Sequence, residues 1–235
     1  MPGHGPDEAP RPEERAVHTP PMTSHAHSRD AVPLVGILLL DDVAVLDFAG
    51  PYEVCSGTTG PSGAPYVRVI TVGTEQEIRC RGGLRVRPDH GLADCPALDA
   101  LIVPGGPGAD DRTPVQDEII LPFLRERADS TAIVASVCTG AFLLGRAGLL
   151  DGRKATTHSS ALQALTEEFP AVDVIAAKVV DEGRILTAAG VSSGIDLALH
   201  LFERWFGPEA RARCRGRSRR SLALASRSGP RGRRR

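Results

Sequence analysis

The most constraining feature of the chain is a strand-like run that stops at a cysteine and resumes as a helix-like pattern. Residues 133–137 are mostly apolar and rich in β-branched side chains, Cys138 follows them, and small residues lead into an apolar stretch that ends at Leu144. A strand that turns sharply into a helix at one nucleophilic side chain is a nucleophile elbow, here with Cys in place of Ser. The alternative is a buried core thiol, since free Cys is among the most buried residue types.

An elbow of this kind has chemical consequences. Cys138 would lie at the start of a helix, where the field of the peptide dipoles favours the reactive thiolate. The backbone N–H of Thr139, just past the nucleophile, would be free to bind a developing anion. Residues 139–141 are small enough to let a substrate approach closely. We therefore expect Cys138 to act as a nucleophile with Thr139 as an adjacent donor.

Strand-like and helix-like segments alternate along the middle of the chain. Strands are expected over 35–40, 66–72, 101–103, 154–158, 172–180 and 184–187, a hairpin or edge extension over 78–86, and helices over 48–56, 115–128, 159–169 and 192–206. This alternation predicts a parallel sheet covered by helices on both faces. Ligands bind such sheets beyond the C-terminal strand ends. The loops at 41–47, 105–108, Cys138 and His158 are expected to converge there.

Composition divides the 235 residues into a domain and two tails. Residues 1–32 are rich in Pro, His and charge and have almost no aliphatic side chains, which predicts disorder. Residues 33–210 carry the alternating pattern and are expected to form one domain. Residues 211–235 hold eleven Arg and no acid. Two interpretations of that tail stay open: a basic arm that contacts nucleic acid, or a reading-frame change near the end of the coding sequence.

Several classes of protein are disfavoured. No apolar run reaches ~18 residues and the N-terminus has no apolar leader, so neither a membrane span nor a signal peptide is expected. The five Cys include no CxxC pair and match neither a disulfide framework nor a zinc site. We therefore expect a cytoplasmic protein without metal or cofactor, in which Cys55, Cys80 and Cys95 are inert thiols.

Five ordered motifs between residues 34 and 210 resemble the ThiJ/PfpI superfamily, and within it the isonitrile hydratase-like branch. They are VLDFAGPYEV at 45–54, VPGG at 103–106, SVCTGA at 136–141, GLLDG and ATTH within 148–158, and AGVSSGID at 189–196. The resemblance implies a class I glutamine amidotransferase-like fold, which is a flavodoxin-like three-layer sandwich. It also implies a homodimer.

The resemblance gives Asp47 and Thr139 roles beside Cys138. Asp47 matches the acidic residue that contacts the nucleophile in isonitrile hydratase-like proteins. Burial beside a thiolate raises the pKa of a carboxyl, which would let Asp47 hold and donate a proton. The alternative is an N-cap, because a helix is expected to begin near Phe48. Thr139 matches a residue linked to catalysis, and capping the elbow helix is its alternative.

Two further matches concern the walls of the site. Gly105 and Gly106 match a PGG turn whose glycines permit close backbone approach. The Gly106 N–H is expected to join that of Thr139 in a two-donor anion hole, a role compatible with a plain tight turn. His158 matches a pocket His of relatives and is expected to bind substrate as a donor, or to serve as a base. Relatives often carry an aromatic residue where this chain has Ser159.

One departure from the superfamily's sequence pattern narrows the range of functions that the resemblance implies. The PfpI-type peptidase has His directly after its Cys, where this chain has Thr139, so a peptidase-like triad is disfavoured. The resemblance then implies a cofactor-independent enzyme that adds water to an isonitrile to give an N-substituted formamide. A glyoxalase- or deglycase-like enzyme on small aldehydes is the alternative.

A different class of function is a ligand-sensing domain related to AraC-type transcription regulators. Those proteins carry a C-terminal pair of helix-turn-helix units. Only the Arg-rich segment follows Ala210 in this chain. We therefore expect a small-molecule substrate and no nucleic-acid partner.

Overall fold

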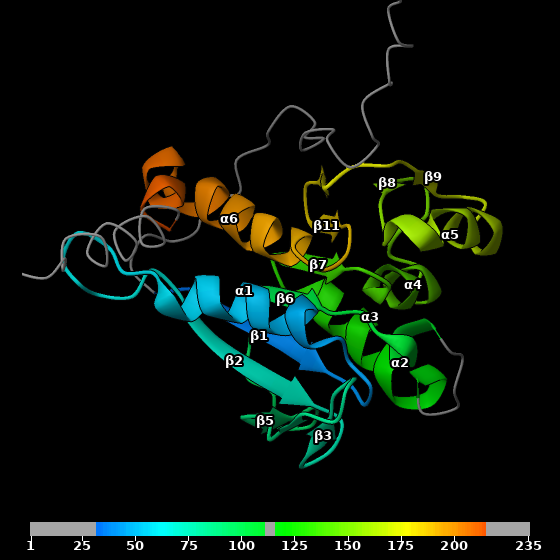
Figure 1. Cartoon of the computed structure of the whole chain (residues 1–235), viewed down its shortest axis with the longest axis horizontal. Helices are drawn as coiled ribbons and strands as arrows, with labels where there is room; N and C mark the ends of the chain where they lie inside the picture. Colours follow the sequence, from blue (N-terminus) through cyan, green and yellow to red (C-terminus); the bar gives the residue numbers. More distant parts are fainter. Residues whose placement is uncertain (1–31, 111–115, 215–235) are drawn as a thin grey trace, which may run out of the picture.

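A seven-stranded sheet forms the centre of the protein, a computed structural model of which describes residues 32–110 and 116–214 (Figure 1). The strand order is β10-β11-β7-β6-β1-β2-β5. The strands are β1 (Leu34–Leu39), β2 (Arg68–Gly73), β5 (His90–Gly91), β6 (Ala100–Val103), β7 (Ile133–Val137), β10 (Val179–Glu182) and β11 (Ile185–Ala188). Within this sheet only the β10–β11 pair is antiparallel. The predicted α/β fold with a mostly parallel sheet is confirmed.

Two small sheets lie outside the central one. Strands β3 (Ile78–Arg79) and β4 (Arg85–Val86) form the predicted hairpin. Strands β8 (Lys154–Ala155) and β9 (Asp173–Val174) pair in parallel and are shorter than predicted. One reason is that the N–H of Thr156 bonds to the side-chain Oγ1 of Thr187 at 2.8 Å, so the strand pairing does not continue past Ala155.

Helices cover both faces of the sheet. On one face, α1 (Val45–Gly57) and α6 (Ser193–Phe206) lie side by side, as Figure 1 shows. The opposite face carries α2 (Pro107–Asp110), η2 (Gln116–Ile120), α3 (Leu121–Ser130), α4 (Gly140–Arg146), η3 (Ser159–Ala161) and α5 (Leu162–Glu168). Within the described part of the chain, no helix has the length and apolar character needed to cross a bilayer.

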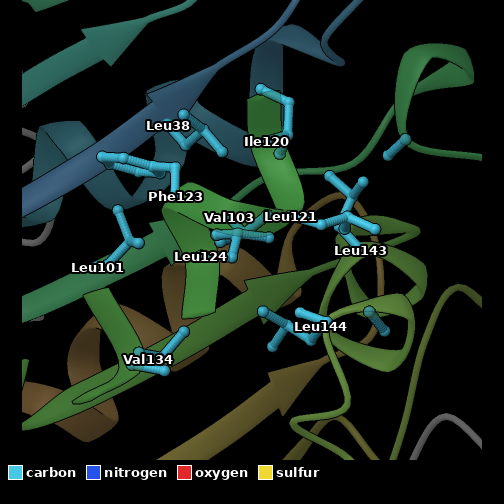
Figure 2. Close-up of a cluster of buried hydrophobic side chains, with 14 of the residues drawn as sticks. Leu38, Leu101, Val103, Ile120, Leu121, Phe123, Leu124, Val134, Leu143 and Leu144 are labelled. Atoms are coloured by element: carbon cyan, nitrogen blue, oxygen red, sulfur yellow. The ribbon is translucent and has the colours of Figure 1, made fainter. Parts of the chain in front are cut away.

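The core consists of two hydrophobic clusters, one on each face of the sheet. Figure 2 shows side chains of the cluster that contains Leu124 of α3, Leu143 of α4, and Leu101 and Val134 of the sheet. Fully burying one such side chain contributes about 1.5–3 kcal/mol. This packing fixes α4, and with it the turn that carries Cys138.

Helix α1 begins three residues earlier than predicted. Its N-cap is Ala44, which makes no side-chain cap hydrogen bond. Asp47 therefore lies inside the first turn, and the N-cap alternative for Asp47 is wrong.

Most of the two predicted tails lies outside the described residues. Of residues 1–32 the structure describes only Val32, and of residues 211–235 it describes 211–214. Residues 208–214 are helical, so helical structure continues past the predicted domain boundary at 210.

Candidate functional site

The candidate site lies where the sheet order reverses, at the C-terminal ends of β1 and β6. This is where open α/β sheets bind ligands. Asp47 follows β1, Gly105 follows β6, Cys138 follows β7 and Val191 follows β11. Because these strands are neighbours in the sheet, four segments far apart in the sequence meet at one edge.

Cys138 has the backbone geometry of an elbow. Its φ is +57°, in the left-handed region, which costs an L-residue about 1–2 kcal/mol. Neighbouring strands and loops hold it there. Its N–H donates to the carbonyls of Ala188 at 3.0 Å and Ala189 at 3.3 Å, and its carbonyl accepts from Oγ1 of Thr157 at 2.9 Å. The thiol is half-buried, so a small molecule can reach it.

Asp47 supplies a buried carboxyl next to the thiol. The residue is 1% exposed, and its Oδ1 accepts a hydrogen bond from the N–H of Val191 at 3.2 Å. Burial raises the pKa of Asp47, while the Cys138 side chain, backbone donors at Val191 and Gly105 and the charge of His158 lower it in part. Among the described residues, no hydrogen bond to Oδ2 of Asp47 meets the usual distance and angle limits.

The Asp47 carboxyl and the Cys138 thiol are two acids that lie side by side. Two acids in contact avoid carrying two negative charges at once. Burial favours the protonated form of Asp47, since it raises the pKa of that carboxyl. The pair can therefore hold one proton and one negative charge, which is the state needed for a nucleophile beside an acid.

Thr139 locks the PGG turn to the elbow. Its Oγ1 accepts from the N–H of Gly106 at 3.0 Å and donates to the Gly106 carbonyl at 3.2 Å. The predicted two-donor anion hole is thus not formed in this state, because the Gly106 donor is already engaged by the threonine hydroxyl. The Thr139 N–H has no acceptor among the described residues and stays available to an anion.

Gly105 allows the close approach of the two turns. A Cβ at this position would lie 2.6 Å from the Thr139 nitrogen and 2.9 Å from the Cys138 Cβ. No L side chain fits that space. Gly106 has φ +139°, so it needs glycine for its backbone conformation as well.

His158 lies near the Cys138 thiol. Its Nδ1 is 2.8 Å from Oγ of Ser160 and accepts from the Ser160 N–H at 3.3 Å. A Cβ at Gly190 would lie 2.3 Å from the His158 Cδ2 and 3.1 Å from the Cys138 Sγ. The imidazole and the thiol therefore flank the same glycine.

Sequence reasoning missed three residues of this site. Thr157 holds the Cys138 carbonyl, Gly190 lies between thiol and imidazole, and Val191 binds Asp47. The motifs at 148–158 and 189–196 contain all three residues, but a local motif does not reveal which atoms bond across the fold. Ser192 is the N-cap of α6 but makes no side-chain cap hydrogen bond.

Metal binding finds no support in the described residues. They contain no group of three or more His, Cys, Asp or Glu side chains placed to hold an ion.

The fold and site define an α/β protein with a strained cysteine at the C-terminal edge of a parallel sheet, beside a buried carboxyl. Residues 34–204 match the model of the DJ-1/PfpI family, and the chain belongs to that family.

Among curated relatives, the chain is 38% identical to isonitrile hydratase of Pseudomonas putida over 176 residues, 74% of this chain and 72% of the relative. It is 32% identical to the HTH-type transcriptional regulator GbdR of Pseudomonas aeruginosa, covering 76% of this chain but 48% of the regulator. A solved ThiJ/PfpI family protein from Pseudomonas syringae aligns with a TM-score of 0.66 at 26% identity, covering 90% of this chain and 84% of the other.

Proposed function

We propose that the protein is an isonitrile hydratase-like enzyme in which Cys138 is the nucleophile and Asp47 the acid. The observation that carries the proposal is the buried Asp47 carboxyl, with its raised pKa, beside a thiol in strained elbow geometry. The 38% identity to an isonitrile hydratase over most of both chains supports it.

The first half of the reaction forms a covalent adduct. The Cys138 thiolate attacks the terminal carbon of R–N≡C and makes a C–S bond. Asp47 gives its proton to the same carbon, which leaves a thioimidate, R–N=CH–S, and an aspartate carboxylate. The Thr139 N–H, which has no acceptor among the described residues, is available to negative charge that develops during attack.

The second half hydrolyses the adduct. Water adds to the thioimidate carbon while Asp47 takes one proton from it and passes that proton to the nitrogen. The hydroxyl proton of the resulting R–NH–CH(OH)–S species then returns to Asp47, the C–S bond breaks and the formamide R–NH–CHO leaves. Asp47 is again protonated and Cys138 is again a thiolate, so one water is consumed and no redox partner is needed.

Turnover of a small isonitrile tests the proposal. Formation of the N-substituted formamide is followed by NMR for the wild type, Cys138→Ser and the matched control Cys214→Ser. Cys214 lies at the other end of the domain, beside Thr58 at the C-terminus of α1. We expect turnover in the wild type and the control and none in Cys138→Ser. Equal turnover in all three proteins would remove Cys138 from the mechanism.

Two other functions predict different results when the same proteins are assayed. A relative 28% identical over 61% of this chain is a glutathione-independent glyoxalase of Caenorhabditis elegans. Turnover of methylglyoxal with no turnover of isonitriles would favour that chemistry. Binding without turnover of either compound would favour a ligand-sensing role, as in the regulator relatives.

The proposal includes a cytoplasmic homodimer. Three exposed apolar side chains supply surface that such an interface would bury: Leu46 is 43% exposed, Leu84 50% and Val191 51%. Light scattering at micromolar concentration should return twice the chain mass, and a monomer mass would contradict the dimer.

A further inference from the structure

We infer that Ser160 is a positioning residue that fixes the His158 ring with its proton on Nε2, so that the ring offers a hydrogen-bond donor on the side of Cys138. The catalytic consequence rests on the proposed function. The tautomer itself does not depend on any reaction.

His158 caps a short helix with its ring. It is the N-cap residue of η3, and the capping acceptor is the ring Nδ1, which receives the N–H of Ser160 at 3.3 Å. The Ser160 hydroxyl approaches the same nitrogen at 2.8 Å. Both polar groups of one residue thus face one ring atom.

A backbone amide decides the protonation of that ring atom. An amide N–H can only donate, so Nδ1 must present its lone pair to it. A neutral imidazole carries one proton, which is then on Nε2. The Ser160 hydroxyl can donate or accept, and beside an unprotonated Nδ1 it donates.

The other edge of the ring faces the site. Cδ2, which is bonded to Nε2, lies with the Cys138 Sγ against Gly190. The ring is also near Asp47, since a proton added to His158 lowers the pKa of that carboxyl. Ser160 therefore holds the Nδ1 edge away from the site and leaves the Nε2 edge toward it.

This arrangement distinguishes between the two roles considered for His158. A ring with Nε2–H cannot take the Cys138 proton through Nε2, so His158 is not the base that activates the thiol. It can instead donate to a water or to negative charge that develops on bound substrate. Proton transfer is left to Asp47.

The decisive measurement is the side-chain ¹⁵N NMR spectrum of the full chain, in which His158 is identified by the signals lost in His158→Gln. The two tautomers give opposite shifts at Nδ1 and Nε2. We expect Nε2–H in the wild type. Ser160→Asp adds a carboxylate that only accepts, so the share of Nδ1–H should rise.

Ser159→Asp is the matched control, because it adds the same charge one residue away and Ser159 makes no hydrogen bond to the ring in the structure. Its spectrum should match the wild type. Nδ1–H in the wild type, or equal spectra for the two Asp variants, would overturn the inference.

A kinetic arm connects the tautomer to catalysis. In Ser160→Ala, kcat for isonitrile hydration should fall about tenfold, as expected for one lost hydrogen bond, with KM little changed. Ser160→Thr keeps the hydroxyl and should restore kcat. An unchanged kcat in Ser160→Ala would remove the positioning role. If no variant hydrates isonitriles, the proposed function fails while the NMR result still decides the tautomer.

Discussion

The backbone N–H of Val191 donates a hydrogen bond to Oδ1 of Asp47 at 3.2 Å. Val191 is β-branched and has φ +59°, a backbone conformation that is unfavourable for such a residue. Its apolar side chain is also 51% exposed. In this strained conformation, the N–H of Val191, in the loop before α6, lies against the first turn of α1. One carboxylate oxygen is thereby engaged, and the other is left for a proton.

Asp47→Asn tests the role of that proton. The change keeps the shape of the side chain and removes its transferable proton, so kcat should fall by ~10² or more, the size of a general-acid contribution. Asp151→Asn, at an exposed turn, is the matched control and should leave kcat unchanged. Full turnover in Asp47→Asn would direct the search for the acid elsewhere, with His158 next.

The same substitution should change the pH dependence of stability. Because burial raises the pKa of Asp47 above 3.8, the folded state binds its proton more tightly than the unfolded state. Stability that this group contributes is therefore lost as the pH rises from 3.8 through the folded pKa. Asp47→Asn avoids that loss. Its melting temperature at pH 7 should equal or exceed that of the wild type, with a smaller difference at pH 4, and a lower value at pH 7 would contradict the assignment.

Thiol labelling should be selective for Cys138. Burial raises the pKa of Cys55 to about 12 and also raises the pKa values of Cys80 and Cys95. Iodoacetamide at pH 6, applied to a Cys214→Ser background, should modify Cys138 far ahead of these three, as peptide mass mapping can show. Similar rates at all four thiols would count against an activated elbow.

Much of the fold could be predicted because the pattern of β1, β7 and α6 is local. Each of these elements forms within one residue of its expected bounds. The start of α1 could not be placed, because Asp47 before an apolar run has the pattern of an N-cap. The burial of Asp47 against the loop before α6 depends on strand order, which no local signal carries. The bond between Thr139 and Gly106 was missed for the same reason.

Gly105→Ala should damage the elbow. The added Cβ would meet the Thr139 nitrogen at 2.6 Å, and backbone atoms cannot yield as a flexible side chain does. We expect a loss of about 1–3 kcal/mol in the free energy of unfolding, typical of overpacking, and loss of most turnover. The control is Gly60→Ala, whose nearest neighbour would be at 3.6 Å. Unchanged turnover in Gly105→Ala would show that the PGG turn does not set the position of Cys138.

Asp181 forms a buried ion pair away from the candidate site. It is 2% exposed, and it binds Arg204 Nη1 at 2.9 Å and His200 Nε2 at 2.7 Å. Burial raises the pKa of Asp181, but the bonds to His200 and Gly183 and the charge of Arg204 outweigh it and hold the pKa below 3.8.

Asp181→Asn should therefore cost about 3–5 kcal/mol in the free energy of unfolding at pH 7, because the partly buried Arg204 guanidinium loses its counter-charge. The stabilisation by Asp181 exists above pH 3.8 and is lost as the pH falls through the lower folded pKa. The difference in unfolding free energy between the variant and the wild type should therefore narrow in acid. Denaturant melts measure both effects, with exposed Asp173→Asn as the control. A gap that stays constant with pH would exclude a charge-based origin.

The most direct test of the central claim is intact-protein mass spectrometry of the enzyme quenched in acid during turnover of an isonitrile. Thioimidate formation adds the whole isonitrile to one cysteine, so the account predicts a transient species heavier by the mass of one isonitrile. Peptide mapping should place it on Cys138, and Cys138→Ser should never show it. Formamide production without such a species, or an adduct on a different cysteine, would contradict the claim that Cys138 is the nucleophile.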